Sequence, residues 1–466
     1  MGWLPLALLT VITAAQLTQL ELVGVKVLPN GLVAAYGSAL WGGRRLPALL
    51  IADVDGSIVY SAILDMRFSG AFLDVTAVNG SYYAVGYVRG VVGRQAVLLA
   101  KLGDNGLEWV KALGGDISDY AKAVVRVGDD LLIACVTRSY GLLRGSDILI
   151  LRVNADGELE GAWALGVPAY EDFVEKAYAV GAEVLLVGTT WSYNVSFSDA
   201  ILVWLRNGSA EAVVVGGVDV DEGYAAVPAS GNVILVGSTR SSSIGQSDAY
   251  VAVVGRMLYS VRAVGWPSYD GFTATCLRDG SYVLFGYATL DARQDALLVL
   301  ANDSSISEAY IISCGTDATP LTVENYGGRV VAALSCSDVL ILALFSSDLH
   351  PLHAVALGNA SKAPASLRVL RVKSLREHCR MLTASWSFKR QELSVRPVTP
   401  LVRSLDAKLV PFNISSTEVK VVVGELEERR SLLKLLMEII ERNLPLLVLI
   451  APVIILVALI LILKRR

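Results

Sequence analysis

Histidine, cysteine and methionine are scarce in this chain of 466 residues, which contains three, five and five of them. A Ser-His-Asp triad is not expected, because only His350, His353 and His378 could supply the base and no Gly-x-Ser-x-Gly turn is present. No phosphate loop or dinucleotide fingerprint occurs, and no cysteine belongs to a Cys-x-x-Cys pair. We therefore predict no catalytic residue, cofactor or metal site, and we place binding ahead of enzymatic activity.

An excess of positive charge is also missing. The net charge is −4 for the whole chain, and the last three residues, Lys464, Arg465 and Arg466, are all basic. The remainder is therefore clearly acidic, which disfavours a nucleic-acid partner because affinity for nucleic acid depends on Lys and Arg contacts to phosphate.

What the chain does have is a repeated unit, clearest from Asp147 to Ser198. The sequence of this unit predicts two hairpins, with turns at 155–157 and at Gly181. They give four short strands rich in Val, Ile, Leu and Tyr, with Asn, Asp and Gly at the turns. A period near 50 residues with four strands per unit is typical of a β-propeller. The Asp that opens the unit recurs at Asp147, Asp199, Asp248, Asp295 and Asp338.

The two ends of the repeat region decide the number of blades. Residues 22–40 are similar to the second half of a unit, and residues 391–411 are similar to a first half. If these halves pair, the ring closes and an unpaired sheet edge is removed. We therefore predict an all-β propeller of about eight four-stranded blades, with seven as the alternative.

The repeat resembles that of the bacterial and archaeal β-propeller repeat proteins (SBBP-like repeats), which are often seven-bladed. The resemblance rests on Asp199-Ala200 before a hydrophobic strand, Leu113-Gly114-Gly115 after a second strand, Asp119-Tyr120-Ala121, and Val187-Gly188-Thr189 at a strand end. It covers most of residues 47–345 and weakens after Ala354. It implies the fold, and it carries no catalytic motif.

The hydrophobic ends indicate export and anchoring. Residues 1–15 are expected to be a signal peptide, the alternative being an uncleaved strand or anchor. Residues 444–463 contain no charge and are long enough for a transmembrane helix. The basic tail 464–466 places the C-terminus in the cytoplasm and the propeller, 16–413, outside the cell membrane. The juxtamembrane stalk, 414–443, carries an apolar stripe. A short coiled coil that oligomerises the ectodomains is the alternative to a solvated helix there.

Several residues are candidates for modification or cross-linking in an exported protein. Cys314 and Cys336 are the one pair of cysteines that we nominate for a disulfide. Asn-x-Ser sequons fall mainly in predicted turns and loops, where a glycan would reach solvent. The candidate glycosylation sites are Asn79, Asn194, Asn207, Asn302, Asn359 and Asn413.

Charge clusters offer two further hypotheses. Residues 362–403 contain ten Lys or Arg, which indicates either an ordinary basic last blade or a patch that contacts anionic lipid or an acidic partner. The opening Asp of each unit is expected to bond backbone N–H groups, and the alternative is a ring of carboxylates that holds a cation in the central channel. The candidate basic patch is Arg368, Arg371, Lys373 and Arg376.

These observations predict a membrane-anchored cell-surface binding protein, or envelope protein, that holds a protein or glycan ligand on one face of the propeller. An extracytoplasmic hydrolase or carbohydrate-active enzyme is the first alternative, and two carboxyl groups in one pocket beside aromatic rings would favour it. A ligand-capture subunit of a membrane complex is the second.

Overall fold

The repeated hairpins form four-stranded antiparallel sheets in the computed structural model of this chain. The structure describes residues 17–426, apart from short gaps. The gaps are at 104–105, 142–144, 167–169, 193–196, 207–208, 230, 243, 338, 359–361, 365, 373–378, 382–386, 393–394, 398, 405–406, 412–414 and 419.

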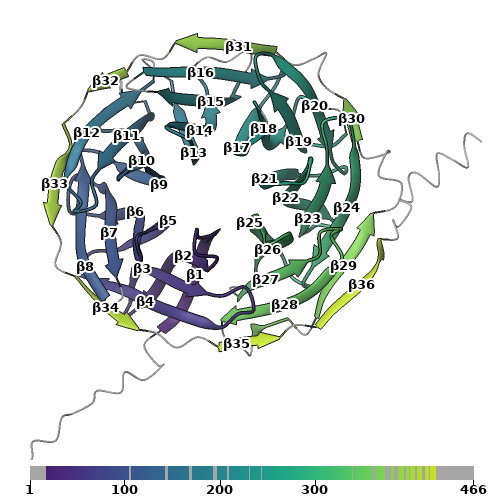
Figure 1. Cartoon of the computed structure of the whole chain (residues 1–466), viewed down its shortest axis with the longest axis horizontal. Coiled ribbons are helices and arrows are strands. Elements are labelled where there is room, and N and C mark those ends of the chain that lie inside the picture. The colour runs from purple at the N-terminus through teal and green to yellow at the C-terminus, as the bar shows by residue number, and fades with distance from the viewer. Residues whose placement is uncertain are drawn as a thin grey trace, which may run out of the picture. The chain divides into compact units, whose positions relative to one another are not determined.

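Seven such sheets make the blades of a β-propeller, and each blade is built from four consecutive strands. Figure 1 shows the first strand of every blade facing the centre of the ring and the fourth lying near its rim. Blades 1 to 3 are β1 (Leu17–Val27), β2 (Val33–Trp41), β3 (Arg44–Ala52), β4 (Ile58–Met66); β5 (Gly70–Val78), β6 (Ser81–Arg89), β7 (Gln95–Gly103), β8 (Gly106–Gly114); and β9 (Asp119–Val127), β10 (Asp130–Thr137), β11 (Asp147–Val153), β12 (Leu159–Leu165).

The remaining four blades follow the same plan. They are β13 (Asp172–Val180), β14 (Glu183–Thr190), β15 (Asp199–Arg206), β16 (Ser209–Gly216); β17 (Asp221–Ala229), β18 (Asn232–Thr239), β19 (Asp248–Val254), β20 (Leu258–Val264); β21 (Asp270–Arg278), β22 (Ser281–Leu290), β23 (Arg293–Ala301), β24 (Ile306–Ser313); and β25 (Ala318–Tyr326), β26 (Arg329–Cys336), β27 (Val339–Phe345), β28 (Pro351–Gly358).

The count of seven corrects the expected eight and agrees with the alternative. Residues 22–40 lie in β1 and β2, which pair with β3 and β4 directly downstream and so make a complete blade. Residues 391–411 do not supply a missing half, because their strands attach to the outer edges of several blades. No half-unit is therefore left over to build an eighth blade.

The segment after β28 forms a belt around the outside of the ring (Figure 1). Its first seven strands add, one per blade, to the outer strands β24, β20, β16, β12, β8, β4 and β28, in that order, and these seven pairings are antiparallel. An eighth strand joins the sheet of blade 6 again, beside the first. The belt strands are β29 (Ser366–Val372), β30 (Cys379–Met381), β31 (Ser387–Glu392), β32 (Val395–Pro397), β33 (Leu401–Ser404), β34 (Ala407–Pro411), β35 (Ser415–Glu418) and β36 (Lys420–Leu426).

Two features close the ring between blades 1 and 7. A buried apolar cluster joins them, with Val33 and Leu50 on the side of blade 1 and Leu342 and Leu357 on the side of blade 7. The belt then crosses the same junction, because β34 pairs with β4 and the next strand, β35, pairs with β28. The first and last blades are thus held together by side-chain packing and by a continuous stretch of backbone that covers both outer edges.

Glycines at the end of the fourth strand, or directly after it, allow the Asp that begins the third strand of the same blade to pack tightly. A side chain at Gly166, Gly216 or Gly265 would overlap the carboxyl group of Asp147, Asp199 or Asp248, respectively. All three carboxylates are fully buried. The glycine at this position of the repeat therefore has a steric cause, since only glycine leaves room for the buried Asp of the same blade.

The chain divides into two compact units, Met1–Gly424 and Glu425–Arg466. The predicted signal peptide, 1–15, the membrane helix, 444–463, and the tail, 464–466, lie outside the described residues, as does most of the helical part of the stalk. Among the residues that are described, we find no helix with the length and hydropathy that a membrane crossing requires.

Candidate functional site

The innermost strand of every blade carries a β-bulge at the same place. One residue is left out of the pairing with the second strand, between Phe72 and Asp74 in β5, for example, and between Val174 and Lys176 in β13. The other five inner strands have the same irregularity. A bulge bends a strand and redirects the side chains that follow it. A cavity in the central channel is lined by several of the residues that directly follow a bulge. Several residues two positions after those line it as well.

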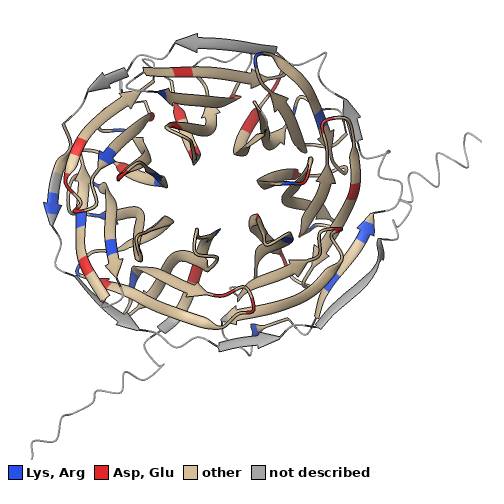
Figure 2. Cartoon of the chain, in the orientation of Figure 1, with Lys and Arg blue, Asp and Glu red and all other residues tan. Residues whose placement is uncertain are grey.

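This channel cavity has a volume of about 410 Å³ and is lined by all seven inner strands. In blades 3, 5 and 6 the lining is small or apolar, as at Ala123, Val125, Ala225, Val227 and Ala274. The charged lining residues come from the other four blades, and charged positions on inner strands are marked in Figure 2. They are Lys26 of β1, Asp74 of β5, Lys176 of β13 and Glu324 of β25.

Lys26 and Asp74 form a closed pair. The Lys26 ammonium lies 3.2 and 3.0 Å from the two oxygens of Asp74 and 3.2 Å from the carbonyl oxygen of Val124. The backbone N–H of Val124 donates to Asp74 Oδ2 at 2.8 Å. These contacts use the three donors of the ammonium and link blades 1, 2 and 3. Burial, reinforced by the charge of Asp74, raises the pKa of the neighbouring Tyr36 hydroxyl well above its ordinary value.

Lys176 and Glu324 do not form a pair of this kind. Neither side chain has a hydrogen bond or an ion pair within 4.0 Å among the described residues. Burial is the main cause that lowers the pKa of Lys176, although Asp74 opposes it. Burial also raises the pKa of Glu324 to about 7, against the opposing charges of Lys26 and Lys176. Both side chains are half-buried in the channel, and each can form a charge-assisted hydrogen bond with a ligand group of opposite charge.

Two tyrosines complete the polar part of the cavity. Tyr36 is buried and Tyr178 is half-buried, and both line the channel. The Tyr178 oxygen accepts a hydrogen bond of 3.2 Å from the backbone N–H of Ala226. Its own hydroxyl hydrogen remains a donor. Burial raises the pKa of Tyr178, so the hydroxyl is neutral near neutral pH.

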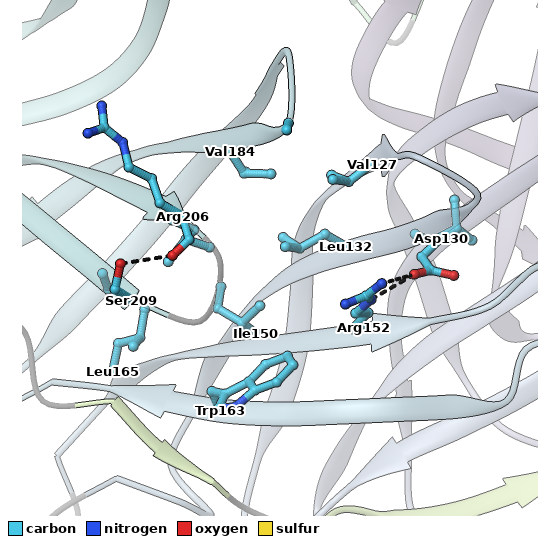
Figure 3. A pocket seen from close by; sticks show the side chains of 14 residues that line it. Val127, Asp130, Leu132, Ile150, Arg152, Trp163, Leu165, Val184, Arg206 and Ser209 are labelled. Carbon is cyan, nitrogen blue, oxygen red and sulfur yellow. Dashed lines mark hydrogen bonds and ion pairs between the residues drawn. The ribbon is translucent and has the colours of Figure 1, made fainter.

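A second hollow, of about 360 Å³, opens between blades 3 and 4 (Figure 3). Leu132, Ile150 and Trp163 line it with apolar surface, and Gly161 leaves the space that the Trp163 ring fills. Its arginines are already paired: Arg152 lies 2.5 Å from Asp130 and Arg206 lies 2.8 Å from Glu183. Ligand sites combine apolar lining with a few polar groups that fix orientation. The charged channel meets that description better.

A repeated set of buried carboxylates stabilises the face where the blades join. Asp119 accepts hydrogen bonds from Thr137 Oγ1 at 2.5 Å and Ser139 Oγ at 2.7 Å, and Asp172 accepts the equivalent bonds from Thr190 and Ser192. Asp221 is bonded to Thr239 and Ser241 in the same way. The spacing of 18 residues from Asp to Thr is a signal in the sequence that we did not use. Because these carboxylates are satisfied internally, we assign them to the fold.

The opening Asp residues are placed within the blades and not around the channel. Asp147, Asp199 and Asp248 begin the third strands β11, β15 and β19, and they do not line the channel cavity. For these three residues, the alternative of a ring that holds a cation in the channel is therefore wrong. Asp248 accepts a backbone hydrogen bond of 3.2 Å from Gly245. Within the described part of the chain, no three His, Cys, Asp or Glu side chains are grouped as metal ligands would be.

Cys314 and Cys336 form a disulfide with a Cα–Cα distance of 6.4 Å. Cys314 follows β24 of blade 6 and Cys336 ends β26 of blade 7, so the bond joins two neighbouring blades and does not lie inside one. Cys135 and Cys276 are buried free thiols, and burial raises the pKa of each.

Two of the six sequons lie in described turns. Asn79 is exposed between β5 and β6. Asn302 follows β23, and its side-chain oxygen accepts hydrogen bonds from the backbone N–H groups of Ser304 and Ser305 at 2.9 and 2.7 Å. The others lie outside the described residues: Asn194, Asn207, Asn359 and Asn413.

The basic segment 362–403 is not a single blade. Its strands β29 to β33 belong to the belt and pair with five different blades, so its basic residues are distributed around the rim. Arg368 and Arg371 are exposed on β29, and Arg371 pairs with Glu308 of blade 6 at 3.0 Å. Lys373 and Arg376 lie outside the described residues.

Comparison with known proteins adds no argument about this chain. No family model matches the chain, and no curated protein matches it. Among solved structures, it is similar to the crystal structure of Sqt1 from Chaetomium thermophilum, with 9% identity, 74% of this chain and 84% of that one covered, and a TM-score of 0.39. It is also similar to the phage phi92 endosialidase, with 11% identity, 71% and 58% covered, and a TM-score of 0.23. Neither likeness supports an argument about function.

Proposed function

We propose that this chain is a membrane-anchored, extracellular β-propeller of the bacterial and archaeal repeat type, and that it serves as a cell-surface binding protein. The observation that carries the proposal is the channel cavity, where Lys176 and Glu324 are available to a ligand. A closed ring of sheets is a rigid frame that holds such groups in place.

The disulfide supports the extracellular location. Disulfides persist in oxidising compartments and are rare in the cytosol of most organisms. The bond between Cys314 and Cys336 links two blades of the ring. It therefore fits the predicted signal peptide, 1–15, and the predicted membrane helix, 444–463, which together would place the ring outside.

Binding is favoured over hydrolysis by the state of the two channel carboxylates. A glycosidase of the common type needs a carboxylic acid and a second carboxylate that is free to attack or to activate water. The pKa of Glu324, raised to about 7, would suit the acid. Asp74, however, is occupied by the Lys26 ammonium and by the N–H of Val124. Among the described channel residues, no free carboxylate is thus left to act as the nucleophile or as the base that activates water.

The proposal is tested by surface labelling of cells that express the full chain. A membrane-impermeant amine reagent should label the propeller in intact cells, and carbonate washing should leave the protein in the membrane pellet. A variant that ends after Asn443 should be labelled or secreted but should not sediment with membranes. Labelling that requires cell lysis, or release of the full chain by carbonate, would contradict the location and the anchor.

A further inference from the structure

We propose that the channel cavity binds a small zwitterion, a molecule with one carboxylate and one ammonium group such as a free amino acid or a short peptide. This inference rests on the proposed binding function and adds the chemical class of the ligand. It follows from which channel groups are already used, which are free, and where the free ones lie.

Of the four charged residues in the cavity, two neutralise each other. Lys26 bonds both oxygens of Asp74 and the Val124 carbonyl, at 3.0 to 3.2 Å, so its donors are filled. Asp74 is 6% exposed and also accepts the N–H of Val124. This pair is part of the frame of the channel and has little capacity left for a ligand.

Lys176 and Glu324 carry the two remaining charges. They lie on the inner strands of blades 4 and 7, which are three blades apart in a ring of seven, and they line the same cavity. Their charges interact, since Lys176 opposes the rise in the pKa of Glu324. Neither side chain makes a hydrogen bond to a described residue. A ligand carboxylate would satisfy Lys176, and a ligand ammonium would satisfy Glu324.

A ligand with a single charge fits this arrangement less well. A pure anion would leave Glu324 unpaired and close to a second negative group. A pure cation would do the same to Lys176. A zwitterion satisfies both, and the charge-assisted hydrogen bonds that it forms are the strong kind.

The volume and lining of the cavity indicate the size and polarity of the rest of the ligand. The cavity of about 410 Å³ falls within the usual range of small-molecule pockets, roughly 300 to 1,000 Å³. Ala123, Val125, Ala225 and Val227 provide an apolar wall between the charged positions. The half-buried ring of Tyr178 adds an aromatic surface. A zwitterion with an apolar side chain would therefore fill the site better than glycine.

The test is calorimetric titration of the full chain in detergent with leucine and with leucyl-leucine, beside N-acetyl-leucine, which lacks the ammonium, and leucinamide, which lacks the carboxylate. We expect at least one of the two zwitterions to bind, and each blocked compound to bind at least about tenfold more weakly, because each loses one charge-assisted contact. Lys176→Met and Glu324→Gln should each weaken binding of that zwitterion by a similar factor.

Matched controls separate the site from general charge effects. Lys122 and Glu175 lie at the bulges of β9 and β13, beside the channel positions, and pair with each other at 2.7 Å. Lys122→Met and Glu175→Gln should leave the affinity within about twofold, and circular dichroism should show that all variants are folded. A combined Lys176→Glu and Glu324→Lys variant should recover part of the binding, with the ligand reversed.

Three results would overturn the inference. One is equal binding of the blocked compounds, and another is unchanged affinity in folded Lys176→Met and Glu324→Gln. The third is no binding of either zwitterion. If a protein or glycan ligand were then bound by the ring, the proposed function would stand and only the ligand class would fall. Failure of surface labelling would instead remove the proposed function itself.

Discussion

The ring and its belt are built on opposite principles. In the ring, 28 strands pair with their neighbours in sequence, and the side chains between blades are almost entirely buried. In the belt, seven strands as short as three residues pair with ring strands that can be hundreds of positions away, as β33 does with β8, and an eighth, β36, lies beside the belt strand β29. Local repetition makes the modules, and a non-repeated segment covers their edges. The comparison teaches that closure of this ring does not come from an extra repeat.

Removal of the belt should have the largest effect. A chain that ends after Gly358 would expose the outer edge strands of all seven blades, and open edges promote association between molecules. We expect a loss of at least about 5 kcal/mol in the free energy of unfolding, because many backbone hydrogen bonds disappear. Thermal denaturation and size-exclusion chromatography measure it. A chain ending after Leu426 is the control, and equal behaviour of the two would show that the belt is not a closing device.

A core substitution in the ring should come next. Phe285 of β22 is fully buried, and Phe285→Ala should cost about 3 to 5 kcal/mol in the free energy of unfolding because it leaves a cavity. The matched belt change, Leu401→Ala, removes a side chain that is 54% exposed and should cost under about 1 kcal/mol. Urea denaturation of both variants measures the contrast. Similar losses would mean that ring and belt are equally packed.

The disulfide provides a smaller effect between blades 6 and 7. Replacing both Cys314 and Cys336 by Ser opens a cross-link between residues 22 positions apart, which should lower the free energy of unfolding by about 3 kcal/mol. A reductant should destabilise the native chain to the same extent and leave the double variant unchanged. A reductant effect that persists in the double variant would point to another cross-link.

The pH dependence of stability should also originate in the ring. Burial raises the pKa of Asp221 to about 6 and those of Asp270 and Glu324 to about 7. The native state then holds these protons more tightly than the unfolded state does. The free energy of unfolding should therefore fall as the pH rises from about 4 to about 7, once ionisation in the unfolded state begins.

Asp270→Asn is the variant that isolates this effect. It removes one titrating group with raised pKa, so the fall in the free energy of unfolding over that window should shrink by an amount on the order of 4 kcal/mol. Urea denaturation at several pH values measures the slope. The assignment of raised pKa values would be contradicted if Asp270→Asn had the same slope as the native chain. It would also be contradicted if the free energy of unfolding of the native chain increased with pH over this window.

The channel site shows why part of the structure escaped prediction. In the aligned inner strands, Lys176 occupies the position of Ala123, Ala225 and Ala274, and Glu324 occupies the position of Val125 and Val227. These departures from the repeat were visible in the sequence. Without the closed ring, however, a charged residue in an alternating strand is equally consistent with a solvent-exposed face, so the pattern alone could not assign it to a cavity.

The blades were predictable because their strands and turns are encoded locally. Alternating apolar residues, and Asn, Asp and Gly at turns, determined four antiparallel strands per unit, and the repeat of about 50 residues determined a propeller. The tertiary structure alone decided that seven blades close the ring and that the strands within 366–426 form a belt. It also decided that Lys176 and Glu324 line the same channel cavity. The physical reason is that these features depend on contacts between residues far apart in sequence. Periodicity and turn chemistry report only on neighbours along the chain, so they could not predict those contacts.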